Sequence, residues 1–362
     1  MRREEVTRVV RRRRDPPAGE RGGNALVTIR QIAERCGVSV STVSKALNDA
    51  WDISGDTAAR IRAAAEELGY TPNAAARALK TRRSYSLGIY YSAGREQGLT
   101  HEFFARILNS FKERAEELGY DIFFIGGKLG RRTLGLGEHA RYRNCDGVLI
   151  IVGSDEDASA AAEVAQEGIP TVCIDFGVEG CGCVGSDNIR GMHDLVEYVI
   201  GMGHRRIAYV YGDDSYVTRT RVRSFVDTCR ENGVTVPPEY MVEGRYHDAP
   251  GAQSATRKLL SLSEPPTCII FPDDFSCVGA RNEIERMGLT VPGDVSIAGY
   301  DGISVCQAFS PSLTTLRQNA EAMGVTAAEE ISRMISAGDR RSARRVLIPG
   351  ELIAGETVSR IE

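Results

Sequence analysis

A run of short polar side chains with a single lysine lies between residues 39 and 48, Ser39-Val-Ser-Thr-Val-Ser-Lys-Ala-Leu-Asn48. On a helix, such hydroxyl groups would let the backbone approach phosphates, Lys45 could reach a guanine edge or a phosphate, and Val40 could meet a thymine methyl. The candidate DNA contacts from this run are Ser39, Val40, Ser41, Thr42, Ser44, Lys45 and Asn48. The competing interpretation is a small helical bundle with polar faces, because isolated patterns of this kind give false positives.

Two pairs of adjacent carboxylates, Asp213-Asp214 and Asp273-Asp274, could be offered as a general acid and base. Adjacent side chains point to opposite faces of a strand, and no P-loop or GxSxG arrangement accompanies them. The nine cysteines and five histidines lack the spacing of a zinc site. We therefore predict no catalytic residue, no metal and no cofactor, and we predict that the protein is not an enzyme.

Composition bounds the class of protein. The chain has 362 residues, 42% hydrophobic and 26% charged, and no apolar run approaches the roughly 18 residues that a membrane span needs. The basic start lacks the apolar centre of a secretory signal, so we expect a cytoplasmic, nucleoid-associated protein with no membrane partner. The odd number of cysteines, mostly in apolar runs, predicts reduced and buried thiols.

The charge is distributed unevenly. Residues 1–83 hold 17 lysines and arginines against 10 aspartates and glutamates, whereas the remainder holds 28 against 39. A basic end on an acidic body predicts a polyanionic partner at one end only. Part of the excess comes from residues 1–26, which we expect to be a disordered basic tail, and the natural start could lie near Val27.

Local signals place short helices after this tail. Thr28 followed by Gln31 forms a capping-box pattern, and Gly37 ends that helix. Ser39 can cap a second helix over 40–47, and Ser54 a third that stops at Gly69. We predict a helix-turn-helix domain over 27–71, followed by a short hinge helix and linker over 72–84.

Residues 85–362 alternate apolar strands with amphipathic helices, which implies parallel sheets covered by helices. The expected strands are 87–91, 122–125, 148–152, 171–174, 207–211, 268–271 and 295–298. So many strands fit two α/β subdomains better than one sheet, with the first crossover near 185–188. The predicted fold is a small all-α helix-turn-helix domain plus an α/β core of two subdomains.

The motifs together resemble one family. The run Val27-Thr-Ile-Arg-Gln-Ile-Ala-Glu-Arg-Cys-Gly-Val and the segment after it, Leu68-Gly-Tyr-Thr-Pro-Asn73, Gly203-His-Arg-Arg-Ile207, Val291-Pro-Gly-Asp-Val-Ser296 and Gly299-Tyr-Asp301 are similar to those of the LacI/GalR family of transcription regulators. The resemblance covers nearly everything from Val27 to about Thr357. It implies a core like that of periplasmic sugar-binding proteins, with an effector between the subdomains.

The resemblance also implies roles for single residues. In such proteins the hinge helix folds on DNA, and Leu79 would be an apolar wedge that kinks the duplex in its minor groove. Further DNA contacts implied by the family are Thr28, Asn73, Ala76 and Arg77. In the core, Arg221 and Asp274 would contact the effector, because a forked donor and an acceptor suit a polyhydroxylated ligand. Tyr91 and Ser154, at strand ends, are weaker effector-site candidates.

Each core candidate has a structural alternative. Asp273-Asp274 could cap a helix, and Arg219, Arg221 and Arg223 could form a solvated basic face. The sequence also departs from the family: Ser224 replaces the glycine of R-x-x-G-F, and residues 126–144 carry five glycines where a full helix is usual. Effector identity therefore does not transfer.

These observations predict a homodimeric regulator, by resemblance a repressor, that binds a roughly palindromic double-stranded operator. A small-molecule effector, a sugar or related polar metabolite, would change its DNA affinity. The alternative is a solute-binding protein with only non-specific affinity for DNA.

Overall fold

The computed structural model describes residues 27–47, 50–71, 78, 81, 83–92, 98–151, 158–304, 308–338 and 343–362. The chain divides into two compact units, Met1–Thr81 and Arg82–Glu362. In the described ranges, no helix is both long and apolar enough to pass through a bilayer. The eight described cysteines are free thiols, and all but Cys36 are buried.

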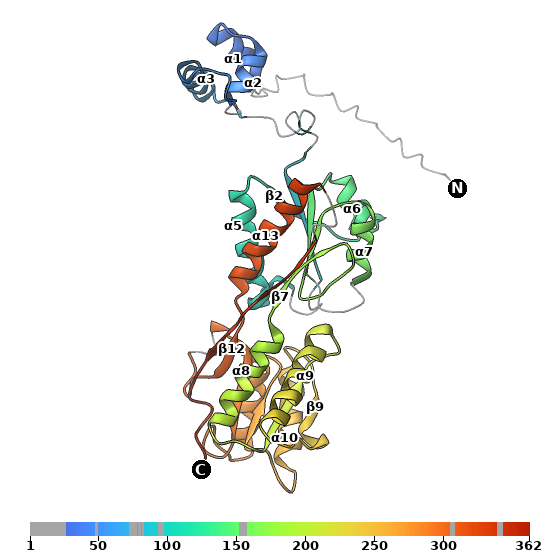
Figure 1. Cartoon of the computed structure of the whole chain (residues 1–362), viewed down its shortest axis with the longest axis vertical. Helices are drawn as coiled ribbons and strands as arrows, with labels where there is room; N and C mark the ends of the chain where they lie inside the picture. The colour runs from blue at the N-terminus through green and yellow to red at the C-terminus, as the bar shows by residue number, and fades with distance from the viewer. Residues whose placement is uncertain are drawn as a thin grey trace, which may run out of the picture. The chain divides into compact units, whose positions relative to one another are not determined.

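The first unit contains α1 (Ile29–Cys36), α2 (Val40–Leu47) and α3 (Gly55–Glu67) (Figure 1). The predicted start and stop signals act as expected: the Thr28 amide donates to Gln31 Oε1 at 2.7 Å, and Gly37 takes a left-handed conformation with φ 63°. Ile32, Val43 and Ile61, one from each helix, have no exposed surface. This small core fixes which face of α2 remains outside.

The second unit contains two six-stranded sheets. The first is parallel throughout, in the order β13-β7-β6-β5-β1-β2. Its strands are β1 (Ser86–Tyr91), β2 (Asp121–Phe124), β5 (Gly147–Ile151), β6 (Thr171–Ile174), β7 (Gly182–Ser186) and β13 (Arg345–Ile348). Helices α5 (Glu102–Glu117) and α13 (Ala320–Ala337) cover one face, and α6 (Leu136–Tyr142) and α7 (Ala158–Gln166) cover the other (Figure 1). Along β5, Leu149 packs in the first layer and Val148 in the second.

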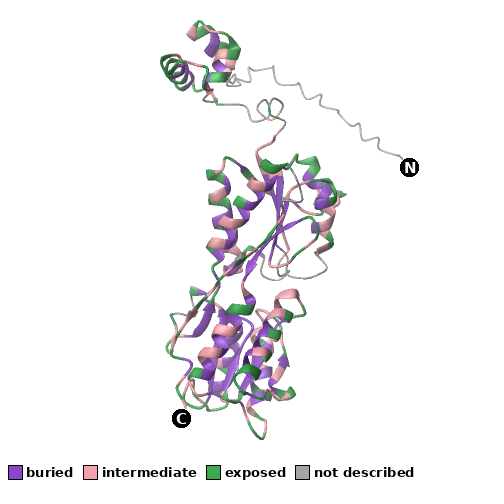
Figure 2. Cartoon of the chain, viewed as in Figure 1, coloured by how far each residue is buried: buried purple, intermediate pink, exposed green. Residues whose placement is uncertain are grey.

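The second sheet has the order β14-β12-β11-β10-β8-β9, with only β14 antiparallel. Its strands are β8 (Ile207–Tyr211), β9 (Met241–Glu243), β10 (Cys268–Ile270), β11 (Ser296–Asp301), β12 (Thr314–Arg317) and β14 (Glu351–Ile353). Helices α10 (Ala249–Leu260) and α11 (Asp274–Arg286) pack on one face, and α8 (Asn188–Gly201) and α9 (Tyr216–Glu231) on the other. Figure 2 shows the strands of both sheets as the most completely buried elements.

The chain passes between the two sheets three times. It leaves β7 at Ser186 for α8, returns from β12 into α13, and leaves again between β13 and β14. Helix α13 consequently packs beside α5 although some two hundred residues separate them in sequence. The carboxyl ends of strands from both sheets therefore meet where the crossings lie.

The predicted strands all form, within one residue at their ends except for β11, which ends at Asp301, three residues later than predicted. The strands β7, β9, β12, β13 and β14 were not predicted from the sequence; they are short, glycine-containing or preceded by loops. Residues 126–144 form a small hairpin of β3 (Lys128–Leu129) and β4 (Arg132–Thr133) before α6, with Gly130 at φ 62° in its turn. Helix α6 has only seven residues, which explains why the sequence of this segment shows no helical repeat of apolar residues. Two 3-10 turns, Gly98–Thr100 and Pro238–Tyr240, complete the described elements.

Candidate DNA interface and effector site

Helix α2 is held by its inner face and by its cap. Ser39 Oγ accepts a hydrogen bond from the Thr42 amide at 3.1 Å and lies 2.8 Å from Thr42 Oγ1, so both hydroxyls take part in the helix start. On the outer face, Ser39, Val40, Ser41 and Lys45 are exposed, whereas Thr42 and Ser44 are half-buried. Val40 keeps 41% of its surface exposed, which is high for a branched apolar residue.

Thr28 stands at the start of α1 and is also exposed. Its hydroxyl donates to Gln31 Oε1 at 3.0 Å. The described members of the predicted DNA-contact set are therefore accessible or partly accessible on the first unit. The remaining members of the set, Asn48, Asn73, Ala76, Arg77 and Leu79, lie outside the described residues, as does the effector-site candidate Ser154.

Lys45 has a partner that the sequence analysis missed. Its Nζ forms an ion pair with a carboxylate oxygen of Asp52, in the loop between α2 and α3. The hydrogen bond from Lys45 lowers the pKa of Asp52. The side chains are 47% and 34% exposed, so the pair lies at the surface. A carboxylate seven residues after the lysine was the available signal, but loop geometry decides whether the two meet.

Arg221, the predicted effector-site arginine, is buried within the second unit with 3% of its surface exposed. Its Nε donates to Asn188 Oδ1 at 2.7 Å and its Nη1 to the Pro272 carbonyl at 3.1 Å. Its guanidinium carbon lies 3.6 Å from the centre of the Tyr300 ring. The alternative of a solvated basic face is therefore wrong for Arg221, although Arg223 is exposed on the same helix.

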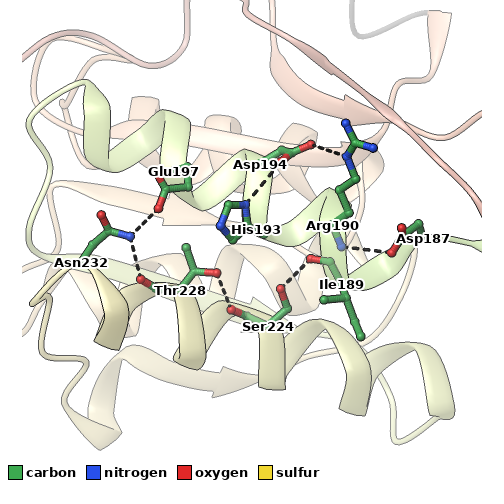
Figure 3. Close-up of polar contacts among 9 residues, drawn as sticks. All are labelled: Asp187, Ile189, Arg190, His193, Asp194, Glu197, Ser224, Thr228 and Asn232. Carbon is green, nitrogen blue, oxygen red and sulfur yellow. Dashed lines mark hydrogen bonds and ion pairs between the residues drawn. The ribbon is translucent and has the colours of Figure 1, made fainter.

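The helix that carries Arg221 is anchored to α8. Ser224 Oγ donates to the Ile189 carbonyl at 2.7 Å, and Thr228 Oγ1 donates to the Ser224 carbonyl at 2.8 Å (Figure 3). Asn232 contacts Glu197 farther along the same pair of helices. The serine that replaces the family glycine is thus small enough for close approach and adds a hydrogen bond between the helices.

Two carboxyl groups lie near Arg221 without pairing with it. The guanidinium lowers the pKa of Asp175 and of Asp301, but burial outweighs it, so that the pKa of Asp175 is raised and that of Asp301 rises to about 7. Asp175 Oδ1 accepts from the Ser186 amide at 3.0 Å, and Asp301 Oδ1 accepts from Gln318 Nε2 at 2.7 Å. Arg221 makes no ion pair with any carboxylate of the described ranges.

Unpaired buried polar atoms gather around the same group. Within the described ranges, Tyr209 Oη, Tyr300 Oη, Ser186 Oγ and Gln318 Oε1 are buried without a hydrogen-bond partner. Native proteins leave few such atoms unsatisfied, because each costs the lost hydration of a polar group. A polar ligand at this place would meet both charges and unpaired hydrogen-bonding groups.

Asp274 is fully buried, and the protein itself occupies both of its oxygens. Oδ2 accepts from the Ile303 amide at 2.8 Å and Oδ1 from Thr315 Oγ1 at 2.5 Å. Burial raises the pKa of this carboxyl well above its ordinary value. Its neighbour Asp273 is the N-cap of α11 and accepts from the Ser276 amide at 2.7 Å. The capping alternative thus holds for Asp273, while Asp274 stays a predicted effector contact.

A ring contact joins the two halves of the second unit. The His101 and His247 ring centres lie 3.9 Å apart, and Phe275 stacks on His247 at 5.4 Å. Burial and the nearby His247 lower the pKa of His101 to about 3. Tyr91 is half-buried close by, edge-on to Phe104 at 5.9 Å, and burial raises its pKa to about 12. Neither histidine lies in a pattern that could have drawn attention to it.

A helix-turn-helix unit joined to a core of two α/β halves defines a DNA-binding transcription regulator. The description "Bacterial regulatory proteins, lacI family" matches residues 28–73, and "Periplasmic binding protein-like domain" matches residues 196–358. A probable HTH-type transcriptional repressor, ExuR of Bacillus subtilis, is 30% identical over 93% of this chain and 99% of its own length. The chain belongs to the lacI family of bacterial regulatory proteins.

Other relatives agree with this placement. The HTH-type transcriptional repressor PurR of Haemophilus influenzae is 28% identical over 93% of this chain and all of its own length. The lac repressor dimer bound to operator and an anti-inducer has a TM-score of 0.75 at 24% identity, and covers 92% of this chain with 99% of its own. A CelR–cellobiose complex has a TM-score of 0.67 at 24% identity, and covers 91% of this chain with 99% of its own. At 24% identity, the similarity to these solved structures supports the fold alone.

Proposed function

We propose that this regulator is a homodimeric repressor whose affinity for a roughly palindromic operator is changed by a small polar effector. The exposed outer face of α2 supports the first half of the proposal, because it presents hydroxyls, Val40 and Lys45 on a rigid helix. Relatives named as repressors and a neighbour solved as a dimer on its operator favour this output.

The single observation that carries the effector site is the environment of Arg221. A buried guanidinium stands near two carboxyl groups without an ion pair, beside tyrosine and glutamine atoms that lack partners. A ligand with several hydroxyl or amine groups would satisfy these groups together. The neighbour solved with cellobiose is consistent with a sugar or a related polar metabolite.

Effector binding would change how the two halves of the core meet, and this change would be passed to the DNA-binding unit. The contacts between His101 and His247 and between the Ser304 amide and Glu102 join the halves and would have to adjust. Couplings of this type are worth about 1–3 kcal/mol. We also expect a cytoplasmic protein without enzymatic activity, as the relatives named as regulators favour.

The experiment is fluorescence anisotropy of the full chain on duplexes from its own promoter, against a scrambled duplex. Lys45→Ala should weaken specific binding by about 1–3 kcal/mol if the lysine reads a base. Leu79→Ala should reduce both affinity and DNA bending if the residue is a wedge. A panel of sugars, nucleosides and sugar phosphates then tests for an effector, with Arg221→Met as the variant that should not respond.

The alternative, a solute-binding protein with only non-specific affinity for DNA, gives a different result. Its binding would be weak, blind to sequence and steeply dependent on salt, because only phosphate contacts would contribute. Such a result would contradict the regulator proposal even if a sugar still bound to the core.

A further inference from the structure

We propose that Asp52 is a built-in competitor for DNA phosphates, which holds Lys45 and thereby suppresses binding to non-specific DNA. The inference rests on the proposed function, since it requires the outer face of α2 to meet DNA. It adds a specificity-determining residue that lies outside α2 and acts through Lys45.

The geometry supports this assignment. The Asp52 carboxylate pairs with Lys45 Nζ, the one cationic group that α2 carries among its described residues. The loop residue beside it, Trp51, is 96% exposed, so the loop stands out from the helical core. Ser54 caps α3 two residues after Asp52 and fixes where the loop ends.

The pair is exposed, and this decides what it can do. Surface ion pairs add little to the stability of a fold, because water and salt compete for both partners. Asp52 therefore contributes little to folding but places a negative charge where a phosphate would otherwise approach Lys45. On non-specific DNA, a phosphate must displace Asp52 and gains only one contact, with Lys45. On a specific site, additional contacts to bases offset the loss of the Lys45–Asp52 pair.

Other acidic groups of this unit differ in position. Asp56 lies in the first turn of α3, exposed and of the same charge, but it forms no ion pair with Lys45. Glu67 pairs with Arg35 at 3.5 Å, away from α2. Asp56→Asn is therefore a matched control for the loss of one negative charge near the surface.

The test measures binding of the full chain to a fluorescein-labelled duplex of scrambled sequence, between about 50 and 200 mM salt. Four proteins are compared with wild type: Asp52→Asn, Asp56→Asn, Lys45→Ala, and Asp52→Asn combined with Lys45→Ala. Asp52→Asn should bind about 3- to 10-fold more tightly than wild type. Its salt slope should be steeper by about 0.9 for each reading surface on the DNA.

The double variant separates an action through Lys45 from a general effect of charge. With Lys45 removed, Asp52→Asn should add no more affinity than Asp56→Asn does in the wild-type chain. Equal effects of Asp52→Asn with and without Lys45, or of Asp52→Asn and Asp56→Asn, would overturn the inference. No binding of Asp52→Asn to the scrambled duplex at the lowest salt would also overturn the inference, whereas the proposed function fails only if the promoter duplex is not bound specifically either.

Trp51 gives an independent readout, because it is the only tryptophan of the chain. Its emission should change when the scrambled duplex saturates the protein, since the loop that holds Asp52 would then lie against DNA. An unchanged emission at saturation would place this loop away from the duplex and contradict the competition.

Discussion

The cationic side chains of Lys45 and Arg221 are both proposed to bind a partner, but they stand in opposite surroundings. Lys45 is about half exposed and paired with Asp52, whereas Arg221 is buried and held by a side-chain amide, a carbonyl and a tyrosine ring. Water and salt can replace either partner of an exposed pair at little cost. The buried guanidinium cannot exchange its partners in this way. If it left its acceptors, no water would be present to replace the lost hydrogen bonds.

The difference teaches how one chain can bind two kinds of partner. The surface site suits a large polyanion, because phosphate groups can replace the Asp52 carboxylate as the partner of Lys45. The buried site suits a small molecule, because its groups are fixed before the ligand arrives and no reorganisation is needed. The predictions that follow test this contrast, from the largest effect to the smallest.

Replacement of the buried cation should have the largest effect. Arg221→Met removes the charge that stabilises the Asp175 and Asp301 carboxylates, and leaves the acceptors on Asn188 and Pro272 unpaired. We expect the free energy of unfolding, measured with urea, to fall by about 3 kcal/mol. Arg223→Met on the same helix, with an 85% exposed side chain, should change it by less than about 0.5 kcal/mol. Equal losses of stability in the two variants would contradict the proposed difference between buried and exposed cations.

The pH dependence of stability should reveal Asp301. Its folded pKa of about 7 lies above the ordinary 3.8, so between these values the folded state holds a proton that the unfolded state has lost. The stabilisation is complete below about pH 4 and is lost as the pH rises through about 7. Asp301→Asn, which is neutral throughout, should therefore gain about 2 kcal/mol relative to wild type between about pH 5 and 7.

The control for this titration is Asp213→Asn, whose side chain is 56% exposed. The difference from wild type should depend on pH much less for this exposed position than for Asp301→Asn. A flat difference for Asp301→Asn would show that its carboxyl is ionised in the folded protein at neutral pH.

His101 should act in the opposite direction at acidic pH. Its pKa is lowered to about 3 in the folded protein, so the unfolded state binds the extra proton below about 6.5 and stability falls with falling pH. His101→Phe keeps a ring against His247 but does not titrate. It should reduce the loss of stability between about pH 6.5 and 5.5 by about 1 kcal/mol.

His193, a half-exposed histidine on α8, provides the comparison for this variant. His193→Phe also replaces an imidazole by a phenyl ring, and it should change the pH profile of urea unfolding less than His101→Phe does. If both variants change the pH dependence of unfolding equally, the burial of His101 against His247 does not disfavour protonation of His101.

The smallest effect concerns the helix caps of the DNA-binding unit. Ser54 Oγ accepts from the Thr57 amide at 3.4 Å, a long hydrogen bond, so Ser54→Ala should destabilise α3 by about 0.5–1 kcal/mol. Faster amide hydrogen exchange in α3 is the measurement. Ser41→Ala, at an exposed position inside α2, should not increase exchange there, because alanine is the better helix former.

The local features of this protein followed from its sequence. Thr28, Gly37, Ser39 and Ser54 mark helix ends through bonds to residues three or four positions away, so short segments contain the whole signal. The buried strands that are apolar runs bounded by turns, such as β5 and β8, were equally readable, whereas the buried but glycine-containing β7 was not. Arg221 and Lys45 were identified as binding candidates from motifs, which describe residue type and spacing but not surroundings.

The tertiary structure decided what surrounds these groups. The placement of β13 and α13 on the first sheet depends on three crossings of the chain, which no local sequence pattern indicates. The short strand β13 does not by itself indicate that it pairs with β7. Asp175 and Asp301 lie near Arg221, and His101 lies beside His247, only because the two halves pack together; these four residues are far apart in sequence. The contact of Lys45 with Asp52 is set by loop geometry, and the contact of Asp274 with Thr315 by the packing of α11 against β12. Electrostatic energies depend on distance and burial, which sequence order does not specify.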